Sequence, residues 1–262
     1  MVAVVTTDRK CHKESLELAA EMSAKLGLRQ VPRQKESVAE LMERYQADAV
    51  LVALQKELRL HTEAGELFFH QGYQNRISLI AKNLRLGEKD HMTEAMGLQE
   101  GMSVLDCTLG FGADAIVASF GDGVSGSVTG REVSPWFAAV TGYGLQHFLP
   151  GNYPLYAAMR RINVVNEDYL VYLRQQPDNS VDVVYFDPMF RKPLTASSSI
   201  SPLRGVADHR PLSEEAVAEA CRVARLRVVM KEARGSGEFA RLGFHRLVGG
   251  KYSKVHYGVI VV

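Results

Sequence analysis

From Gly101 to Met230 the chain alternates short apolar runs with longer stretches in which apolar residues recur at helical spacing. The short runs predict strands at residues 103–107, 127–132, 162–166, 181–186 and 227–230. The longer stretches predict helices at residues 113–120, 135–148, 169–175 and 214–224. This alternation predicts an α/β fold built on a mostly parallel sheet.

The end of the chain breaks the alternation. A short helix is predicted to end at residues 239–242, and two strands follow at 244–248 and 255–262 with no helix between them. Strands joined without a crossover helix pair in antiparallel fashion. The pattern therefore predicts one antiparallel strand at the end of the sheet.

Residues 1–72 predict a small α/β subdomain of their own. Strands are expected at residues 2–6 and 49–54, a hairpin at 58–60 and 66–69, and helices at 13–26 and 37–45. Residues 73–262 then form the second domain. Its first part, residues 73–100, is a helical lead-in, with one helix at 75–84 and another that Asp90 caps and that ends near Met96.

The amino-acid composition is that of an ordinary globular protein. The chain is 46% hydrophobic and 23% charged with a net charge of +1, so it is an ordinary globular chain and not a purely electrostatic nucleic-acid binder. Residues 191–234 are locally basic, with nine Lys/Arg against five Asp/Glu. The three cysteines lack metal-ligand spacing, which predicts no metal site and a reducing compartment. Without a signal peptide or a membrane-length apolar run, we expect a cytoplasmic protein.

A glycine turn follows the first predicted strand of the second domain. Gly110 and Gly112 permit a sharp turn and close approach of the backbone to a ligand. Asp106 and Asp114 flank the turn. Negative charge there would repel a pyrophosphate, but it suits the sulfonium and the α-ammonium of S-adenosylmethionine. The turn favours a methyl-donor site, with a dinucleotide site or a purely structural turn as alternatives.

Polar residues also follow the next two predicted strands. Glu132 can accept hydrogen bonds from both ribose hydroxyls of a donor, or it can be a solvent-facing residue at a strand end. Asn166, Glu167 and Asp168 suit an adenine amino group. Asp168 equally suits the N-cap of the helix at 169–175, and the two roles are compatible.

The tetrapeptide Asp187-Pro188-Met189-Phe190 follows an apolar strand, where ligands of open α/β sheets bind. Asp187 and the Pro188 carbonyl can accept hydrogen bonds from an exocyclic amino group. Pro188 stiffens the backbone, and Phe190 can stack on a planar base. The alternative is a strand-end turn with Phe190 in the core. The tetrapeptide predicts the catalytic centre of methyl transfer to an amine.

These motifs resemble the class I S-adenosylmethionine-dependent methyltransferases. More narrowly, the D-x-T-x-G-x-G-x-D turn and the Asp-Pro-Met-Phe tetrapeptide are similar to those of the bacterial small-subunit ribosomal RNA guanine-N2 methyltransferases. The resemblance implies a Rossmann-like seven-stranded sheet and a guanine amino group as acceptor. It places the donor on Asp106, Thr108, Gly110, Phe111, Gly112, Asp114, Glu132, Val133, Glu167, Asp168 and Asp187.

A ribosomal RNA acceptor requires contacts to phosphate and a base turned out of its helix. We expect basic side chains near the tetrapeptide and in the lead-in to supply the phosphate contacts. The candidates are Arg191, Lys192, Arg204, His209, Arg210, Lys231 and Arg76. Each of them is equally compatible with a solvated surface charge.

Three alternatives to a guanine-N2 enzyme stay open. Clamps of the Asp/Asn-Pro-x-aromatic type also serve methyl transfer to adenine N6 and to protein glutamine. A ribosome-assembly module could keep the donor pocket without turnover. A nicotinamide-dependent oxidoreductase is the third alternative, and it would bind that cofactor in a titration.

Overall fold

The structure is a computed structural model of residues 1–262, and it describes residues 1–69, 83, 86–87, 90–149, 153–189 and 206–262. The chain divides into two compact units. Among described residues, the first unit holds residues 1–69, 135–148 and 206–207, and the second holds the remainder. The predicted boundary after residue 72 lies outside the described residues, as do most residues of the predicted helix at 75–84.

The first unit is built on a five-stranded sheet in the order β2-β1-β3-β4-β5. β1 pairs in parallel with β2 and β3, whereas β3, β4 and β5 form antiparallel pairs. The strands are β1 (Ala3–Thr7), β2 (Arg29–Gln30), β3 (Ala49–Ala53), β4 (Leu58–Thr62) and β5 (Gly65–Phe68). Its helices are α1 (Lys13–Leu26), α2 (Val38–Tyr45) and α6 (Pro135–His147).

Local sequence explains these first elements well. β3 is apolar and fully buried, and the hairpin of β4 and β5 turns at Gly65 as predicted. α2 begins with a capping box, in which the Ser37 side chain accepts from the Glu40 N–H and the Glu40 side chain accepts from the Ser37 N–H. β2 was not predicted.

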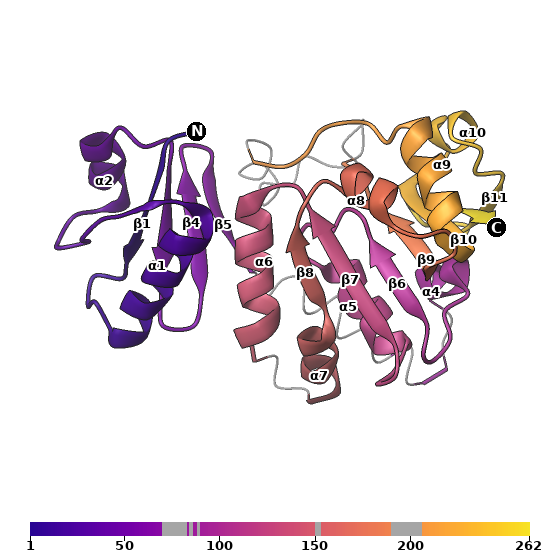
Figure 1. Ribbon diagram of the computed structural model, residues 1–262, viewed down its shortest axis with the longest axis horizontal. Coiled ribbons are helices and arrows are strands. Elements are labelled where there is room, and N and C mark those ends of the chain that lie inside the picture. The colour runs from indigo at the N-terminus through magenta and orange to yellow at the C-terminus, as the bar shows by residue number, and fades with distance from the viewer. Residues whose placement is uncertain (70–82, 84–85, 88–89, 150–152, 190–205) are drawn as a thin grey trace. The chain divides into compact units, whose positions relative to one another are not determined.

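The second unit carries a seven-stranded sheet in the order β11-β12-β10-β9-β6-β7-β8 (Figure 1). The strands are β6 (Ser103–Asp106), β7 (Ser127–Glu132), β8 (Asn163–Asn166), β9 (Val181–Phe186), β10 (Ala224–Ala233), β11 (Arg246–Val248) and β12 (Val255–Val261). All pairs are parallel except those of β12, which runs antiparallel to both β10 and β11. The predicted α/β fold with one antiparallel strand is therefore confirmed.

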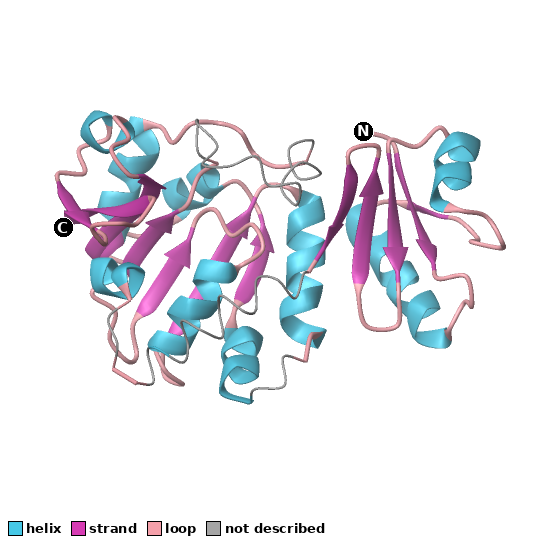
Figure 2. Ribbon diagram, turned by 180° about the vertical axis from the view of Figure 1, so that it is seen from behind, coloured by secondary structure: helices cyan, strands magenta, loops and turns pink. Residues whose placement is uncertain are grey.

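Helices of this unit alternate with its strands (Figure 2). They are α4 (His91–Met96), α5 (Ala113–Gly121), α7 (Tyr153–Arg161), α8 (Tyr169–Gln175), α9 (Glu214–Val223) and α10 (Glu238–Arg241). Asp90 caps α4 as predicted, since its carboxylate accepts from the N–H groups of Met92 and Thr93. The unit has a core in which β9 and β10 pack against α9, with Phe186, Val228 and Ala220 fully buried. In the described part of the chain, no helix has the length and apolar character needed to cross a membrane.

Candidate active site

The glycine turn lies between β6 and α5. Gly110 and Gly112 both have positive φ, +51° and +72°, a backbone region that favours glycine. Inside the turn, the Gly112 N–H donates to the Leu109 carbonyl over 2.7 Å. Among the described residues, a Cβ on Gly110 would meet nothing closer than the Thr108 carbonyl oxygen at 4.0 Å, which leaves room for a ligand beside this glycine.

Asp106, the last residue of β6, is buried beneath this turn. Its Oδ1 accepts a 3.0 Å hydrogen bond from the Thr108 N–H. Burial raises the pKa of Asp106 to about 8, even though the Thr108 hydrogen bond acts in the opposite direction, and the charges of Asp114 and Asp187 raise the pKa further. A pKa of about 8 favours the protonated form of Asp106 at neutral pH, which differs from the negative charge expected there, and its contact with the donor stays a prediction.

Glu132 ties the turn to the end of β7. Its Oε2 accepts from the Gly110 N–H at 2.9 Å, and its Oε1 accepts from the Ser134 N–H at 2.8 Å. The residue is 8% exposed, and burial raises its pKa above the ordinary value. A carboxylate has about four acceptor positions, so these two bonds leave capacity for ribose hydroxyls. Glu132 is not the solvent-facing residue of the alternative interpretation, and its ribose contact stays a prediction.

The residues after β8 mostly bind neighbouring parts of the protein. The Asn166 amide donates to the carbonyl oxygens of Glu132 and Val133, at 2.7 and 3.0 Å. Glu167 accepts from Arg131 Nη1 at 2.8 Å. These bonds brace the carboxyl ends of β7 and β8 against each other, beside the place where the donor is expected.

Asp168 is the N-cap of α8, as one of the two interpretations predicted. Its Oδ1 accepts from the Leu170 and Val171 N–H groups, and its Oδ2 accepts from Arg210. A contact of Asp168 with adenine would share the carboxylate with these three donors. The predicted donor residues Phe111 and Val133 lie between the two glycines and directly after β7, and Val133 is 36% exposed.

The tetrapeptide begins where β9 ends, directly beside the glycine turn. The Asp187 N–H donates to Thr108 Oγ1 over 2.6 Å, which joins the first residue of the tetrapeptide to the turn. Met189 is 40% exposed. Phe190 lies outside the described residues, so its stacking role stays a prediction.

A buried ion network connects the turn and the tetrapeptide. Lys231 Nζ lies 2.8 Å from Asp114 Oδ2 and 2.8 Å from Asp187 Oδ2. The Tyr185 hydroxyl donates to the same Asp114 oxygen over 2.7 Å. Among the described residues, two carboxylates thus share one ammonium.

Lys231 corrects the prediction of a phosphate contact. The residue is 8% exposed, because it lies on the sheet at β10 and faces Asp114 and Asp187. Burial alone would lower the pKa of Lys231, but the two carboxylates raise it above its ordinary value. Lys231 is therefore a charged residue of the site and not a surface cation.

Asp187 has an unusual proton affinity for a residue beside a cation. Burial raises its pKa to about 6, with Lys231 acting in the opposite direction and the Asp114 charge adding to the increase. The carboxylate is ionised at neutral pH and can take up a proton slightly below it. Such a group can hold an amine and also stabilise positive charge on it.

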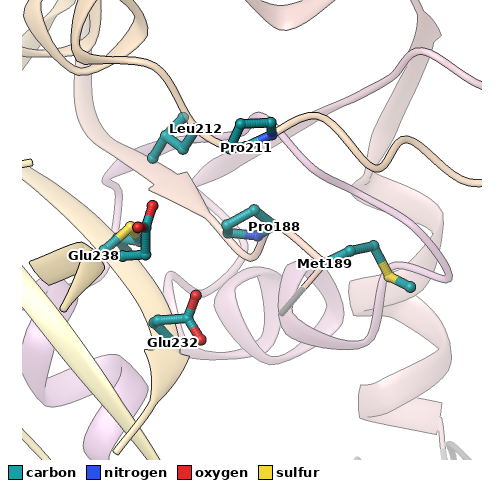
Figure 3. Close-up of a pocket in the computed structure, with 7 residues that line it drawn as sticks. Pro188, Met189, Pro211, Leu212, Glu232 and Glu238 are labelled. Atoms are coloured by element: carbon teal, nitrogen blue, oxygen red, sulfur yellow. The ribbon is translucent and has the colours of Figure 1, made fainter. Parts of the chain in front are cut away.

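A pocket opens beside the tetrapeptide (Figure 3). The pocket is small, with a cavity volume of about 10 Å³, room for about one water molecule. Five apolar residues and two carboxylates line it: Pro188, Met189, Pro211, Leu212, Met230, Glu232 and Glu238. Figure 3 shows Pro188 between Pro211 and Glu232. Glu232 is 5% exposed, and its Oε1 accepts from the Ala233 N–H at 2.6 Å.

The other predicted RNA contacts divide into two groups. His209 is exposed, and Arg210 is exposed but ion-paired with Asp208 and Asp168 at 2.6 Å. Arg191, Lys192, Arg204 and Arg76 lie outside the described residues, so their contacts stay predictions.

Three residues of the site were missed by sequence reasoning. Tyr185 was interpreted only as part of an apolar strand, although its hydroxyl binds Asp114. Glu232 and Glu238 line the pocket beside Pro188. The pairing of β9 with β10 could have indicated Glu232. Met230 is the register partner of Phe186, and Glu232 and Pro188 each come two residues after these partners.

Comparison with known proteins gives one family. The family described as "Putative SAM-dependent methyltransferase" (SAM_MT) matches residues 34–251. The protein YpiP of Bacillus subtilis (strain 168) is 40% identical over 257 residues, which cover 98% of each chain.

A solved structure of a methyltransferase shares the fold. The SAM-dependent methyltransferase NGO1261 from Neisseria gonorrhoeae aligns with a TM-score of 0.59 at 18% identity, covering 98% of this chain and 95% of that chain. TrmN from Thermus thermophilus aligns with a TM-score of 0.43 at 14% identity, covering 98% and 70%. At 18% identity, the similarity to NGO1261 shows the fold alone.

Proposed function

Because this chain belongs to the SAM_MT family, and is thus an S-adenosylmethionine-dependent methyltransferase, we propose that it methylates an exocyclic amino group of a nucleobase. Guanine N2 in ribosomal RNA is the acceptor that we propose first. One observation carries the proposal. The Asp187 N–H is bound to the donor turn through Thr108, while the Asp187 carboxylate is held by Lys231 in the same network as Asp114.

The residues around the glycine turn fit the donor. Among the described residues, the space above Gly110 is open, and the carboxylates of Asp114 and Asp187 nearby suit a sulfonium and an ammonium group. Glu132 has acceptor capacity left for ribose hydroxyls. When bound, the donor supplies an electrophilic methyl group.

Asp187 and the Pro188 carbonyl would hold the acceptor amine. An amine conjugated with a base ring is a poor nucleophile, and two acceptors on its N–H groups turn its lone pair away from the ring. The nitrogen becomes cationic as it gains the methyl group, and the Asp187 carboxylate is already in place to stabilise that charge. The methylated amine then releases a proton to solvent or to Asp187, whose pKa of about 6 permits either.

The tetrapeptide favours guanine over adenine as the acceptor, because position 187 holds Asp rather than Asn and Met189 follows Pro188.

A labelling experiment tests the proposal. The full chain is incubated with methyl-labelled donor and, separately, with bulk RNA, DNA and protein. We expect label in RNA, and digestion to nucleosides should give N2-methylguanosine. Label in adenine or in protein glutamine would replace the proposed acceptor. Donor binding with label in no acceptor would support the assembly-module alternative instead.

Asp187→Ala tests the clamp itself. Removing one preorganised electrostatic contact of this kind costs about 10²–10³ in turnover, and donor affinity should stay close to that of the parent. Asp178→Ala is the matched control, because Asp178 is an exposed carboxylate, 69% exposed and paired with Arg222. Unchanged turnover in Asp187→Ala would refute the clamp.

A further inference from the structure

Arg33, in the first unit, is a buried cation without a partner. The residue is 9% exposed. Its Nε and Nη1 are buried and make no hydrogen bond within the part of the chain that the structure describes. Burial lowers the pKa of Arg33 below its ordinary value, and the charge of Arg9 acts in the same direction, whereas the Asp8 carboxylate acts in the opposite one. A buried guanidinium with unsatisfied donors is costly, and a bound anion is one way to satisfy it.

Arg33 lies at the carboxyl end of the parallel strands of the first unit. After β2, the Val31 N–H donates to the Val5 carbonyl, and Thr6 Oγ1 donates to the Val31 carbonyl. The chain thus continues alongside β1, so Arg33 comes level with Asp8, the first residue after β1. Ligands of open α/β sheets bind at this edge.

The charges around Arg33 at this edge are mostly positive. The loops that follow β1, β2 and β3 carry exposed Arg9, Lys10, Lys35 and Lys56. Three acidic residues accompany them, and each has a cationic neighbour: Asp8 with His12, Glu36 with Arg44, and Glu57 with Arg59. The Asp8 carboxylate is turned to His12 Nδ1 at 2.5 Å and does not pair with Arg33.

We propose that Arg33 and the basic loops after β1, β2 and β3 form a binding site for a phosphate group, supplied by the backbone of an RNA strand. A guanidinium donates charge-assisted hydrogen bonds to phosphate, and Arg33 Nε and Nη1 have no acceptor among the described residues. The exposed basic residues continue the positive surface, as a strand of several phosphates requires. Only the RNA source rests on the proposed function; the phosphate site does not.

Thermal unfolding of the full chain tests the phosphate site. Inorganic phosphate should raise the Tm more than sodium chloride of equal ionic strength does, in the parent and in Arg33→Lys. Arg33→Met should lose this difference. Without phosphate its Tm should equal or exceed that of the parent, because an unpartnered buried charge has been removed. Lys25→Met, which removes an exposed charge at the far end of α1, is the control and should behave like the parent.

Two results would overturn the phosphate site. A phosphate effect that survives in Arg33→Met would place the anion elsewhere. A lower Tm of Arg33→Met in chloride alone, with no such change in Lys25→Met, would mean that Arg33 is paired inside the protein.

RNA binding distinguishes the source of the phosphate. A fluorescent single-stranded RNA is titrated with the protein at several salt concentrations. In Arg33→Met, the slope of the logarithm of the binding constant against the logarithm of the salt concentration should fall in magnitude by about 0.7, which corresponds to the loss of one phosphate contact. The affinity should drop by the same factor for different RNA sequences. A phosphate effect on Tm without any change in the RNA slope would refute RNA as the source. Methyl transfer does not enter either measurement, so failure of the proposed enzymatic function remains a separate result.

Discussion

Replacing Lys231 with methionine removes the one ammonium that Asp114 and Asp187 share. Both contacts are 2.8 Å long, and the Lys231 side chain is 10% exposed, so water cannot easily take its place. Breaking a buried pair in this way costs about 3–5 kcal/mol, because uncompensated charge remains in the protein. Part of that cost is avoided if one carboxylate takes up a proton.

The effect on turnover follows from the pKa of Asp187. With a pKa of about 6, the carboxylate is largely ionised at neutral pH. Like-charge repulsion without Lys231 raises the pKa further, and an increase to about 8 would leave roughly a tenth of the molecules ionised at pH 7. We therefore expect turnover to fall about tenfold at pH 7 in Lys231→Met, and to recover as the pH approaches 9.

The assay is a pH profile of kcat with labelled donor, accompanied by chemical denaturation of the same variant. Lys254→Met, at an exposed position, is the control for loss of one positive charge. Lys231→Arg should keep the acidic limb of the profile closer to that of the parent. If Lys231→Met shows the parent profile and the parent free energy of unfolding, the network has no role in holding Asp187.

Three further predictions concern the second unit, which carries the seven-stranded sheet. In the parent, turnover should rise as the pH passes about 6, because Asp187 then loses its proton. The free energy of unfolding should fall between pH 3.8 and about pH 6, because the native state holds the Asp187 proton more tightly than the unfolded chain does. Opposite slopes would contradict the assignment of this pKa to Asp187. Gly112→Ala should lose about 1–2 kcal/mol of stability and bind donor more weakly by calorimetry, whereas Gly27→Ala, at a similar φ of +65°, should lose stability only. Asp168→Ala should lose about 1 kcal/mol in denaturant unfolding as a missing N-cap, and a fall in donor affinity beyond about tenfold would instead show an adenine contact.

Much of the fold could be predicted because local pattern and tertiary packing agree. Residues 183–186 of β9 are apolar and buried, and the strand lies in the interior of the sheet, while α1 has the bounds that its periodicity indicates. α7 was missed because Pro154 resembles a turn signal, although proline is tolerated in the first turn of a helix. β2 was missed because two exposed residues carry no periodicity, and only their pairing with β1 makes them a strand.

Site residues at strand ends could be predicted from the sequence, whereas contacts between side chains of different strands could not. Asp106 and Asp187 come at the ends of apolar runs, Glu132 ends the predicted strand at 127–132, and each lies at the expected edge of the sheet. Lys231 was assigned to the surface because lysines are rarely buried without a partner, and sequence does not show the partners. Its two carboxylates are 117 and 44 residues away in the chain.

The ion network around Lys231 also depends on the register of the strands. Asp114 lies at the start of α5, the helix after β6, Asp187 follows β9 and Lys231 lies in β10, and these three strands are neighbours in the sheet. Side chains alternate between the faces of a strand, so a slip of β10 by one residue would bring Met230 or Glu232 to the position of Lys231. Either misfolded arrangement would leave two carboxylates without their cation. The chemistry of the site thus penalises the wrong pairing of β10 during folding, and the correct sheet and a competent site would form together.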